Sequence, residues 1–460
     1  MEEFTAAAFC AAGAEKVVSN EVRMMARAET GCVVLDSGFG KVRFTAGLAG
    51  LYRALMSLRA ADRLLIEAGR FPAGDFDALF EGTRAIHWED FVPRGMALAV
   101  SKVRSARSRL AAETAVQAVV HKAAAERLCA AYGIRRLPDF PGAGSAAGDA
   151  AQAAALRGGE SVGRHGSILL KRGEGAGHTA DAGVRVAELR VHIEKDTASV
   201  LLDISGEPLF KRGYRPAGGT APLRESTAAA IILLSGWRRK FPLYDPFCGS
   251  GTVVIEAALY AWDQAPGLGR RFALSGLACG DAAVEAAVRQ ELAEKVDYNR
   301  PVCIRGSDTD QAAVDLARVN LRSAMALQRK ALAAGLPGPP AEGEGVPAVG
   351  GVIPGVEIQC LPMEKARPNF GAAHPDTGAD TTPPGFIITN PPYGKRLGSA
   401  EEAEARYRDM AVFAKTFPGW KMAVVCNHPG FESHFGARAD ACHEIKSGAV
   451  EAWLYQYERL

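Results

Sequence analysis

The sequence lacks the features that mark a secreted, disulfide-bonded or membrane-spanning chain. Its 460 residues include nine cysteines, which are scattered and never spaced as C-x-x-C, so neither a disulfide framework nor a zinc ribbon is expected. No run reaches about 18 apolar residues, and the first residues, MEEFTAAAFCAAGAEK, carry two acids where a signal peptide carries Lys or Arg. We therefore expect a soluble, cytoplasmic protein with reduced thiols that does not contact a membrane.

The chain also has almost no net charge. Lys and Arg together number 54 and Asp and Glu number 52, which gives a formal charge of +2. No global field therefore favours a polyanion, and contact with nucleic acid must come from local patches. One such patch lies between residues 94 and 109, a segment that contains no acid. The basic residues of this segment are Arg94, Lys102, Arg104, Arg107 and Arg109.

Hydrophobic periodicity divides the chain into three parts. At about 100–200 residues per domain, this length and 48% hydrophobic content allow two to four domains with sizeable cores. The first part, to about residue 66, alternates apolar runs with amphipathic stretches, which favours a small α+β unit. The second has a helix-like run at 113–128 and two strand-like runs within 184–205. A Gly/Ala-rich stretch at 138–183 interrupts it, and we interpret this stretch as an inserted flexible loop.

After Ser205 the pattern changes to a βαβα rhythm, which predicts an α/β fold with a mostly parallel sheet. Its short apolar strands are expected at 241–246, 302–308, 356–361, 386–392 and 421–427. Two Pro/Gly-rich stretches, 336–355 and 371–385, lack periodicity and are expected to be surface excursions. The end of the chain, 443–460, predicts two strands joined near Ser447 and Gly448, so that an antiparallel hairpin closes the sheet.

A glycine-containing turn between a strand-like and a helix-like run is the first candidate binding element. Glycines at such a turn let a ligand approach the backbone, and the helix start presents free N–H groups. A phosphate loop would need a Lys after the last glycine, and a dinucleotide fold would need G-x-G-x-x-G; neither is present. The leading carboxylate suits a ligand with cationic or hydroxyl groups, although a plain strand-to-helix turn is the alternative. The residues are Asp245, Pro246, Phe247, Cys248, Gly249, Ser250, Gly251 and Thr252.

The next predicted strand ends in two acids, Asp308 and Asp310. An acid at the tip of the second strand of a doubly wound sheet is placed to bind ribose hydroxyls. We favour Asp308 for that role. Asp310 could equally be the N-cap of the helix that follows.

The most specific string is Asn390-Pro391-Pro392-Tyr393, directly after an apolar strand. At background residue frequencies it should occur by chance in roughly one chain per thousand of this length. Proline has no N–H, so the turn is rigid and its carbonyls remain free as acceptors. The Asn390 side-chain oxygen and a neighbouring carbonyl can then hold an exocyclic NH₂ group while Tyr393 stacks on a base. A rigid turn with a packed tyrosine is the alternative, and guanine, adenine and cytosine amines would all fit.

These three elements, in this order, resemble those of class I S-adenosylmethionine-dependent methyltransferases that modify amino groups. The stretch Leu201–Trp237 and the strings LRAADRLL, FDALFEGTRAIHWEDF, KVRSARSRL and NPPYGKRLG further resemble bacterial ribosomal-RNA guanine-N2 methyltransferases that carry a THUMP domain. The resemblance covers nearly the whole chain outside the Gly/Pro-rich stretches. One departure is Pro362, which stands where many methyltransferases have an acid for the adenine amine. Glu364 or backbone groups could replace that acid.

The resemblance implies a domain plan, a reaction and partners. It implies a ferredoxin-like domain at 1–66, a THUMP RNA-binding domain at 67–204 and a Rossmann-like methyltransferase domain at 205–460, with a seven-stranded sheet. The implied cofactor is S-adenosylmethionine, and the implied substrate is the N2 amine of a guanine in 23S rRNA within a pre-50S particle. No metal and no catalytic base are expected. The residues expected to contact RNA are Arg104, Arg107, Arg109, Arg212, Arg215, Lys395 and Arg396, which could instead form solvated faces.

Several alternatives remain open at this point. A tRNA guanine-N2 methyltransferase would have the same domain plan, whereas a DNA adenine-N6 enzyme would leave the long N-terminal half without a purpose. A non-catalytic RNA-binding protein would not need the intact motifs. A metal enzyme would use scattered residues whose spacing matches no common zinc pattern. They are Cys426, His428, His434, Cys442 and His443.

Overall fold

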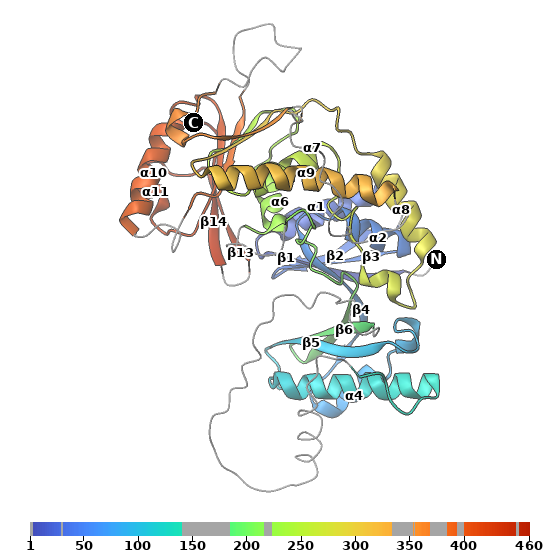
Figure 1. Ribbon diagram of the computed structural model, residues 1–460. Helices are drawn as coiled ribbons and strands as arrows, with labels where there is room; N and C mark the ends of the chain where they lie inside the picture. The colour runs from blue at the N-terminus through green and yellow to red at the C-terminus, as the bar shows by residue number, and fades with distance from the viewer. Residues whose placement is uncertain are drawn as a thin grey trace. The chain divides into compact units, whose positions relative to one another are not determined.

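The computed structural model (Figure 1) describes most of the chain. The described residues are 3–28, 31–139, 185–215, 223–333, 353, 355–368, 384–392, 400–447 and 450–460. They form two compact units. The first comprises Met1–Leu64, Pro208–Arg271 and Asp281–Leu460, and the second comprises Leu65–Glu207 and Phe272–Gly280. Most of the three Gly/Pro/Ala-rich stretches named above lies outside the described residues.

The larger part of the first unit is a seven-stranded sheet with strand order β10-β9-β8-β11-β12-β14-β13. Neighbouring strands from β10 to β12 run parallel, and β14 is antiparallel to both β12 and β13. This confirms the predicted parallel sheet with a terminal hairpin. The strands are β8 (Leu243–Asp245), β9 (Ile304–Asp308), β10 (Val356–Cys360), β11 (Phe386–Thr389), β12 (Lys421–Cys426), β13 (Ala441–Ser447) and β14 (Val450–Tyr457).

Helices alternate with these strands, as the βαβα rhythm predicts. Helix α7 is buried along almost its whole length, which explains why its sequence, TVVIEAALYA, has no polar stripe. An aromatic cluster that includes Tyr407, Phe417 and Trp420 packs the α10 side of the core. The helices are α6 (Glu225–Leu234), α7 (Thr252–Ala261), α8 (Ala282–Glu294), α9 (Gln311–Ala333), α10 (Ala400–Ala414) and α11 (Phe431–Phe435), with a 3₁₀ turn at Met363–Lys365.

The N-terminal part of the first unit has the βαββαβ element order of a ferredoxin-like fold, with strands in the order β2-β3-β1-β4. Its elements are β1 (Phe4–Cys10), α1 (Glu15–Met25), β2 (Val33–Gly38), β3 (Lys41–Ala46), α2 (Leu48–Ser57) and β4 (Ala61–Pro72). Two polar contacts join it to other residues of the first unit. Arg59 donates to the carbonyl of Gln264 at 2.8 Å, and Arg53 pairs with Glu291 at 2.5 Å. Residues 1–64 of this part, which the sequence predicts as a ferredoxin-like domain at 1–66, belong to the same compact unit as the sheet β10-β9-β8-β11-β12-β14-β13.

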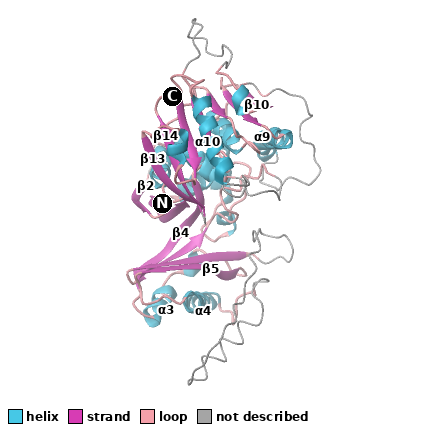
Figure 2. Cartoon of the chain, turned by 90° about the vertical axis from the view of Figure 1, so that its left-hand side faces the viewer, coloured by secondary structure: helices cyan, strands magenta, loops and turns pink. Residues whose placement is uncertain are grey.

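The second unit contains the end of β4 with three further strands, in the order β4-β7-β6-β5. Strands β5 and β6 are parallel, and β6 and β7 form a hairpin whose turn residues, Lys195 and Asp196, have φ values of 49° and 54°. Helices α3 and α4 lie side by side against this sheet (Figure 2). The elements are α3 (Phe76–Arg84), β5 (Ala97–Ala106), α4 (Glu113–Tyr132), β6 (Val186–Glu194) and β7 (Thr197–Asp203), with 3₁₀ turns at Trp88–Asp90 and Ala273–Gly276. Within the described part of the chain, no helix is long and apolar enough to cross a membrane.

Candidate cofactor and amine-binding site

The three sequence motifs meet at one edge of the catalytic sheet. Strand β8 lies between β9 and β11, and all three run parallel. The glycine-containing turn follows β8, Asp308 ends β9 and Asn390 follows β11. The chain continues from β8 through β9 to β10 on one side and crosses to β11 on the other. The gap between β8 and β11 is therefore the topological switch point, where open α/β sheets bind their ligands.

The turn after β8, residues 245–252, is called the cofactor loop below. Gly249 and Gly251 have φ values of 50° and 87°, and a Cβ on Gly251 would lie 2.9 Å from the Ala317 side chain on α9. Helix α9 also contributes Asn320, whose amide donates to the carbonyl of Ser250 at 3.1 Å. The loop is thus packed closely against α9, and only glycine fits at position 251.

The carboxylate of Asp308 lies against this loop. Its Oδ2 accepts a hydrogen bond from the backbone N–H of Gly249 at 2.9 Å, and its Oδ1 accepts from the N–H of Asp310 at 3.0 Å. Asp310 in turn accepts from the N–H of Ala312 in the first turn of α9, at 2.9 Å. Asp310 therefore acts as a helix cap, whereas Asp308 lies against the cofactor loop.

Asp245, the first residue of the cofactor loop, is 1% exposed. Its Oδ1 accepts from the Thr389 hydroxyl at 2.6 Å and from the Phe247 N–H at 3.1 Å. Burial raises the pKa of Asp245 to about 7; the two hydrogen bonds oppose this rise, and the nearby Asp308 adds to it. Pro246 and Cys248 are buried, and Phe247 and Ser250 are half-buried. Burial also raises the pKa of the Cys248 thiol, so this side chain is not a candidate nucleophile.

Asn390 is half-buried, but the oxygen of its side chain is fully enclosed. Its Oδ1 is inaccessible to solvent and has no hydrogen-bond partner among the described residues. Leaving a buried acceptor unpaired costs about 1–3 kcal/mol, so this oxygen suits a donor on a bound molecule. Pro391 is buried and Pro392 half-buried. The three remaining site residues from this segment, Tyr393, Lys395 and Arg396, lie outside the described residues.

Arg212 does not fit the RNA-contact prediction. Its side chain is 3% exposed and pairs with Glu256 at 3.5 Å. It also donates to the carbonyls of Leu209 and Arg59. Arg59 and Glu256 are distant in the sequence, so the basic string KRGYR gave no sign that this arginine is buried.

Arg215 is also engaged inside the first unit. It pairs with Glu225 at 3.4 Å and donates to the Thr252 hydroxyl at the start of α7. Its side chain is 18% exposed. This arginine therefore holds the end of the cofactor loop.

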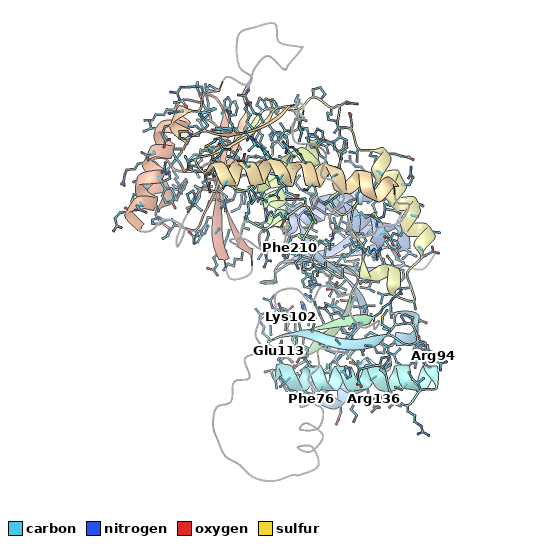
Figure 3. The ribbon with its side chains drawn as sticks, viewed as in Figure 1. Phe76, Arg94, Lys102, Glu113, Arg136 and Phe210 are labelled. Atoms are coloured by element: carbon cyan, nitrogen blue, oxygen red, sulfur yellow. The ribbon has the colours of Figure 1, made fainter. Side chains whose placement is uncertain are left out.

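The basic segment of the second unit is exposed. Arg104, Arg107 and Arg109 all have exposed side chains, and Arg104 and Arg107 form no ion pair within the described residues. Arg104 lies on β5, and the loop that carries Arg107 and Arg109 is fixed by Asp196, which accepts from the Ser108 hydroxyl at 2.7 Å and from the Arg109 N–H at 3.1 Å. Figure 3 places Lys102 near this region and Arg94 at the other end of the unit. Arg94 is therefore not part of the same patch.

The residues of the metal alternative have other partners. Cys426 donates to the Tyr407 hydroxyl at 3.3 Å, His428 accepts from the Gly430 N–H at 3.1 Å, and His434 pairs with a glutamate. Cys442 and His443 are exposed on β13. Across the residues that the structure describes, no group of three or more His, Cys, Asp or Glu is placed to hold a metal.

Comparison with known proteins identifies two domains. Residues 212–335 and 375–456 match the RMKL-like methyltransferase domain, and residues 5–65 match the RlmL ferredoxin-like domain. The chain carries an RMKL-like methyltransferase domain after an RlmL ferredoxin-like domain. S-adenosylmethionine is the cofactor of this methyltransferase. The residues fit it: the cofactor loop follows β8 at the switch point, with Gly249 and Gly251 at positive φ, and Asp308 stands beside that loop.

Relatives of this methyltransferase include YpsC of Bacillus subtilis, which is named as an RNA methyltransferase. It is 29% identical over 99% of this chain and 96% of its own length. The ribosomal RNA large subunit methyltransferase K/L of Syntrophotalea carbinolica is 30% identical over 97% of this chain, which spans 52% of that protein. The chain therefore covers about half the length of that relative.

Solved structures give the same fold. SMU.472, which is named as a methyltransferase and was crystallised with SAH, matches with a TM-score of 0.73 and 28% identity, over 100% of this chain and 99% of its own. A predicted N6-adenine-specific DNA methylase from Listeria monocytogenes matches with a TM-score of 0.73 and 30% identity, over 99% of this chain and 96% of its own.

Proposed function

We propose that this methyltransferase transfers a methyl group from S-adenosylmethionine to the exocyclic N2 amine of a guanine in 23S rRNA. The observation that carries the chemical part is the buried Oδ1 of Asn390, which has no partner among the residues that the structure describes and lies next to the cofactor loop at the switch point. It offers an acceptor to an amine where the methyl donor would bind. The RNA part draws on the K/L relatives, which are named for the large-subunit rRNA. The proposed setting is a pre-50S particle in the cytoplasm.

In the proposed mechanism, the chain's residues position the amine and adjust its electrons. The Asn390 Oδ1 and the Pro391 carbonyl each accept a hydrogen bond from one N–H group of the target amine. These two acceptors favour a tetrahedral geometry at the amine nitrogen. In that geometry the nitrogen lone pair is no longer delocalised into the ring and can point toward the cofactor. Tyr393 would stack on the base, which is extruded from its RNA context. The cofactor supplies an electrophilic methyl group when bound, and positioning at about 3–3.5 Å provides much of the rate enhancement.

An Asn390→Ala variant tests the role of the acceptor. Because Asn390 contributes to the transfer step, turnover should fall at least 100-fold while SAH affinity, measured by calorimetry, stays within about threefold of wild type. A matched control is Asn427→Ala, since Asn427 is half-buried and follows β12 as Asn390 follows β11. The control should retain turnover. Equal losses of turnover and SAH affinity in Asn390→Ala would contradict the assignment.

We further propose that the exposed arginines of the second unit contact RNA phosphates, and that residues 67–204 form a THUMP domain. In support, the compact segment Leu65–Glu207 nearly coincides with that range. The logarithm of the RNA association constant falls linearly with the logarithm of the salt concentration, and each phosphate contact contributes roughly 0.7–0.9 to the steepness of that slope. Replacing Arg104, Arg107 and Arg109 together by Ala should therefore make the slope less steep by about 2–3. Arg438→Ala, an exposed arginine of the first unit, should leave the slope unchanged. An unchanged slope in the triple variant would mean that these arginines form only a solvated face.

Adenine N6 is the second candidate target. The Asn390 acceptor suits any exocyclic amine on a base, and the Listeria relative is named for adenine in DNA. A tRNA guanine is a third candidate, because it needs the same chemistry and the same domain plan. The methylated nucleoside and the nucleic acid that carries it distinguish all three.

A further inference from the structure

The backbone pairing between β8 and β11 stops before either strand ends. The paired residues are Leu243 with Phe386 and Tyr244 with Ile387. Beyond them β8 and β11 have no further paired residues up to the switch point. One side-chain hydrogen bond continues the link across this gap: the Thr389 hydroxyl donates to Asp245 Oδ1 at 2.6 Å, and each of the two residues is 1% exposed.

The two ends of this bond belong to the two loops that bring the reactants together. Asp245 begins the cofactor loop and also accepts from the Phe247 N–H at 3.1 Å, inside that loop. Thr389 directly precedes Asn390, the proposed amine acceptor. On the opposite side of β8, the Tyr244 hydroxyl bonds the Ser307 hydroxyl on β9 at 2.6 Å. Strand β8 is therefore held on both sides by buried side-chain hydrogen bonds, just before the ligand-binding edge.

The composition of β11 makes the hydroxyl of Thr389 conspicuous. All four residues of the strand, FIIT, are buried, and an apolar residue of the same shape would fill a buried β-branched position without the cost of burying a hydroxyl. Val has that shape. Packing alone therefore does not explain the hydroxyl, whereas its bond to the buried Asp245 carboxylate links the two loops.

We propose that Thr389 is a positioning residue which, through Asp245, sets the distance between the cofactor loop and the amine-binding Asn390. This proposal rests on the amine-binding role given to Asn390 above. Asp245 and Thr389 are each 1% exposed, so we expect loss of the bond to affect the methyl-transfer step more than cofactor affinity. Misplacement of reacting groups by about 1 Å can cost about 100-fold in rate.

The test compares Thr389→Val, which removes the hydroxyl, with Thr389→Ser, which keeps it. Thr389→Val should lower kcat about 10- to 100-fold, with the SAM KM and the SAH Kd within about threefold of wild type, and Thr389→Ser should restore most of kcat. Thr83→Val is the matched control, because Thr83 is fully buried and its hydroxyl has no hydrogen-bond partner within the described part of the chain. Wild-type kcat in Thr389→Val, or an equal loss of SAH affinity, would overturn the proposal.

A second measurement does not depend on the substrate. Amide hydrogen exchange of SAH-bound protein should be faster over residues 386–390 in Thr389→Val than in wild type, and unchanged in Thr83→Val. Exchange equal to wild type over this segment would overturn the positioning role, whichever nucleic acid the protein methylates. If the wild-type protein binds SAH but methylates neither RNA nor DNA, the proposed function fails, and the exchange result alone decides the role of Thr389.

Discussion

Replacing Asp245 by Asn should make the protein more stable at pH 8 and should flatten the dependence of its stability on pH. Asp245 is fully buried, and burial raises its pKa from the ordinary 3.8 to about 7. Between these values the folded state binds more protons than the unfolded state. The free energy of unfolding should therefore fall as the pH rises from about 4 to 7, and the full cost of the buried anion is present above pH 7. Asn carries no such charge.

The structure sets the size of this effect. A pKa difference of about 3 units corresponds to roughly 4 kcal/mol, at about 1.4 kcal/mol per unit. Asn keeps an oxygen that can accept from Thr389 and Phe247, but its NH₂ group needs a new partner, at a cost of about 1–2 kcal/mol. The net gain at pH 8 should then be about 2–3 kcal/mol. For a unit of about 300 residues this is a rise in Tm of roughly 3–5 °C.

The assay is scanning calorimetry of wild type and Asp245→Asn, without ligand, at several values between pH 5 and 8. The difference in Tm should be largest at pH 8 and should shrink toward zero, or reverse, at pH 5. Measurement at a matched ionic strength keeps the surface charges comparable between the two proteins. Parallel curves across the whole range would refute the argument that burial of the Asp245 carboxylate costs stability.

Two further outcomes are expected. Gly251→Ala should weaken SAH binding at least tenfold by calorimetry, because Gly251 has a φ of 87° and abuts α9, whereas Gly249→Ala, where the added Cβ meets no atom within 4 Å, should weaken it less. Asp263→Asn should destabilise the protein by about 1 kcal/mol at neutral pH. Burial tends to raise the pKa of Asp263, but its ion pairs with Arg239 and Arg300 outweigh burial and lower the pKa. That difference, followed by thermal unfolding, should disappear as the pH falls through the lowered pKa, and a difference that persists in acid would contradict the ion-pair explanation.

The order and place of the site motifs could be predicted from the sequence because they follow short apolar strands. In a parallel sheet, successive strand ends meet at one edge, so residues after β8, β9 and β11 come together although they lie far apart in the chain. Asp308 and Asn390 were placed in this way. The terminal hairpin could be predicted for a similar reason, since two alternating runs separated by a short polar turn favour antiparallel pairing.

The contacts that lock the site could not be predicted, because they join residues distant in sequence and of ordinary type. The Thr389 hydroxyl reaches Asp245 across 144 positions, and the Asn320 amide reaches Ser250 across 70. Arg212 stands in a basic string, yet its partner Glu256 lies on a buried helix. Charge patterns along a sequence indicate which residues are basic, but only packing decides which of them face solvent.

The most direct test of the proposed function is to incubate the purified protein with S-adenosylmethionine and separated rRNA and tRNA from a strain that lacks the gene, followed by nucleoside mass spectrometry. The account predicts N2-methylguanosine in the 23S fraction and none with Asn390→Ala. N2-methylguanosine in tRNA alone would support the proposed reaction but contradict the assignment of 23S rRNA as the substrate. N6-methyladenosine would contradict the assignment of guanine as the target base. The absence of any newly methylated nucleoside from both RNAs would contradict the proposed function itself.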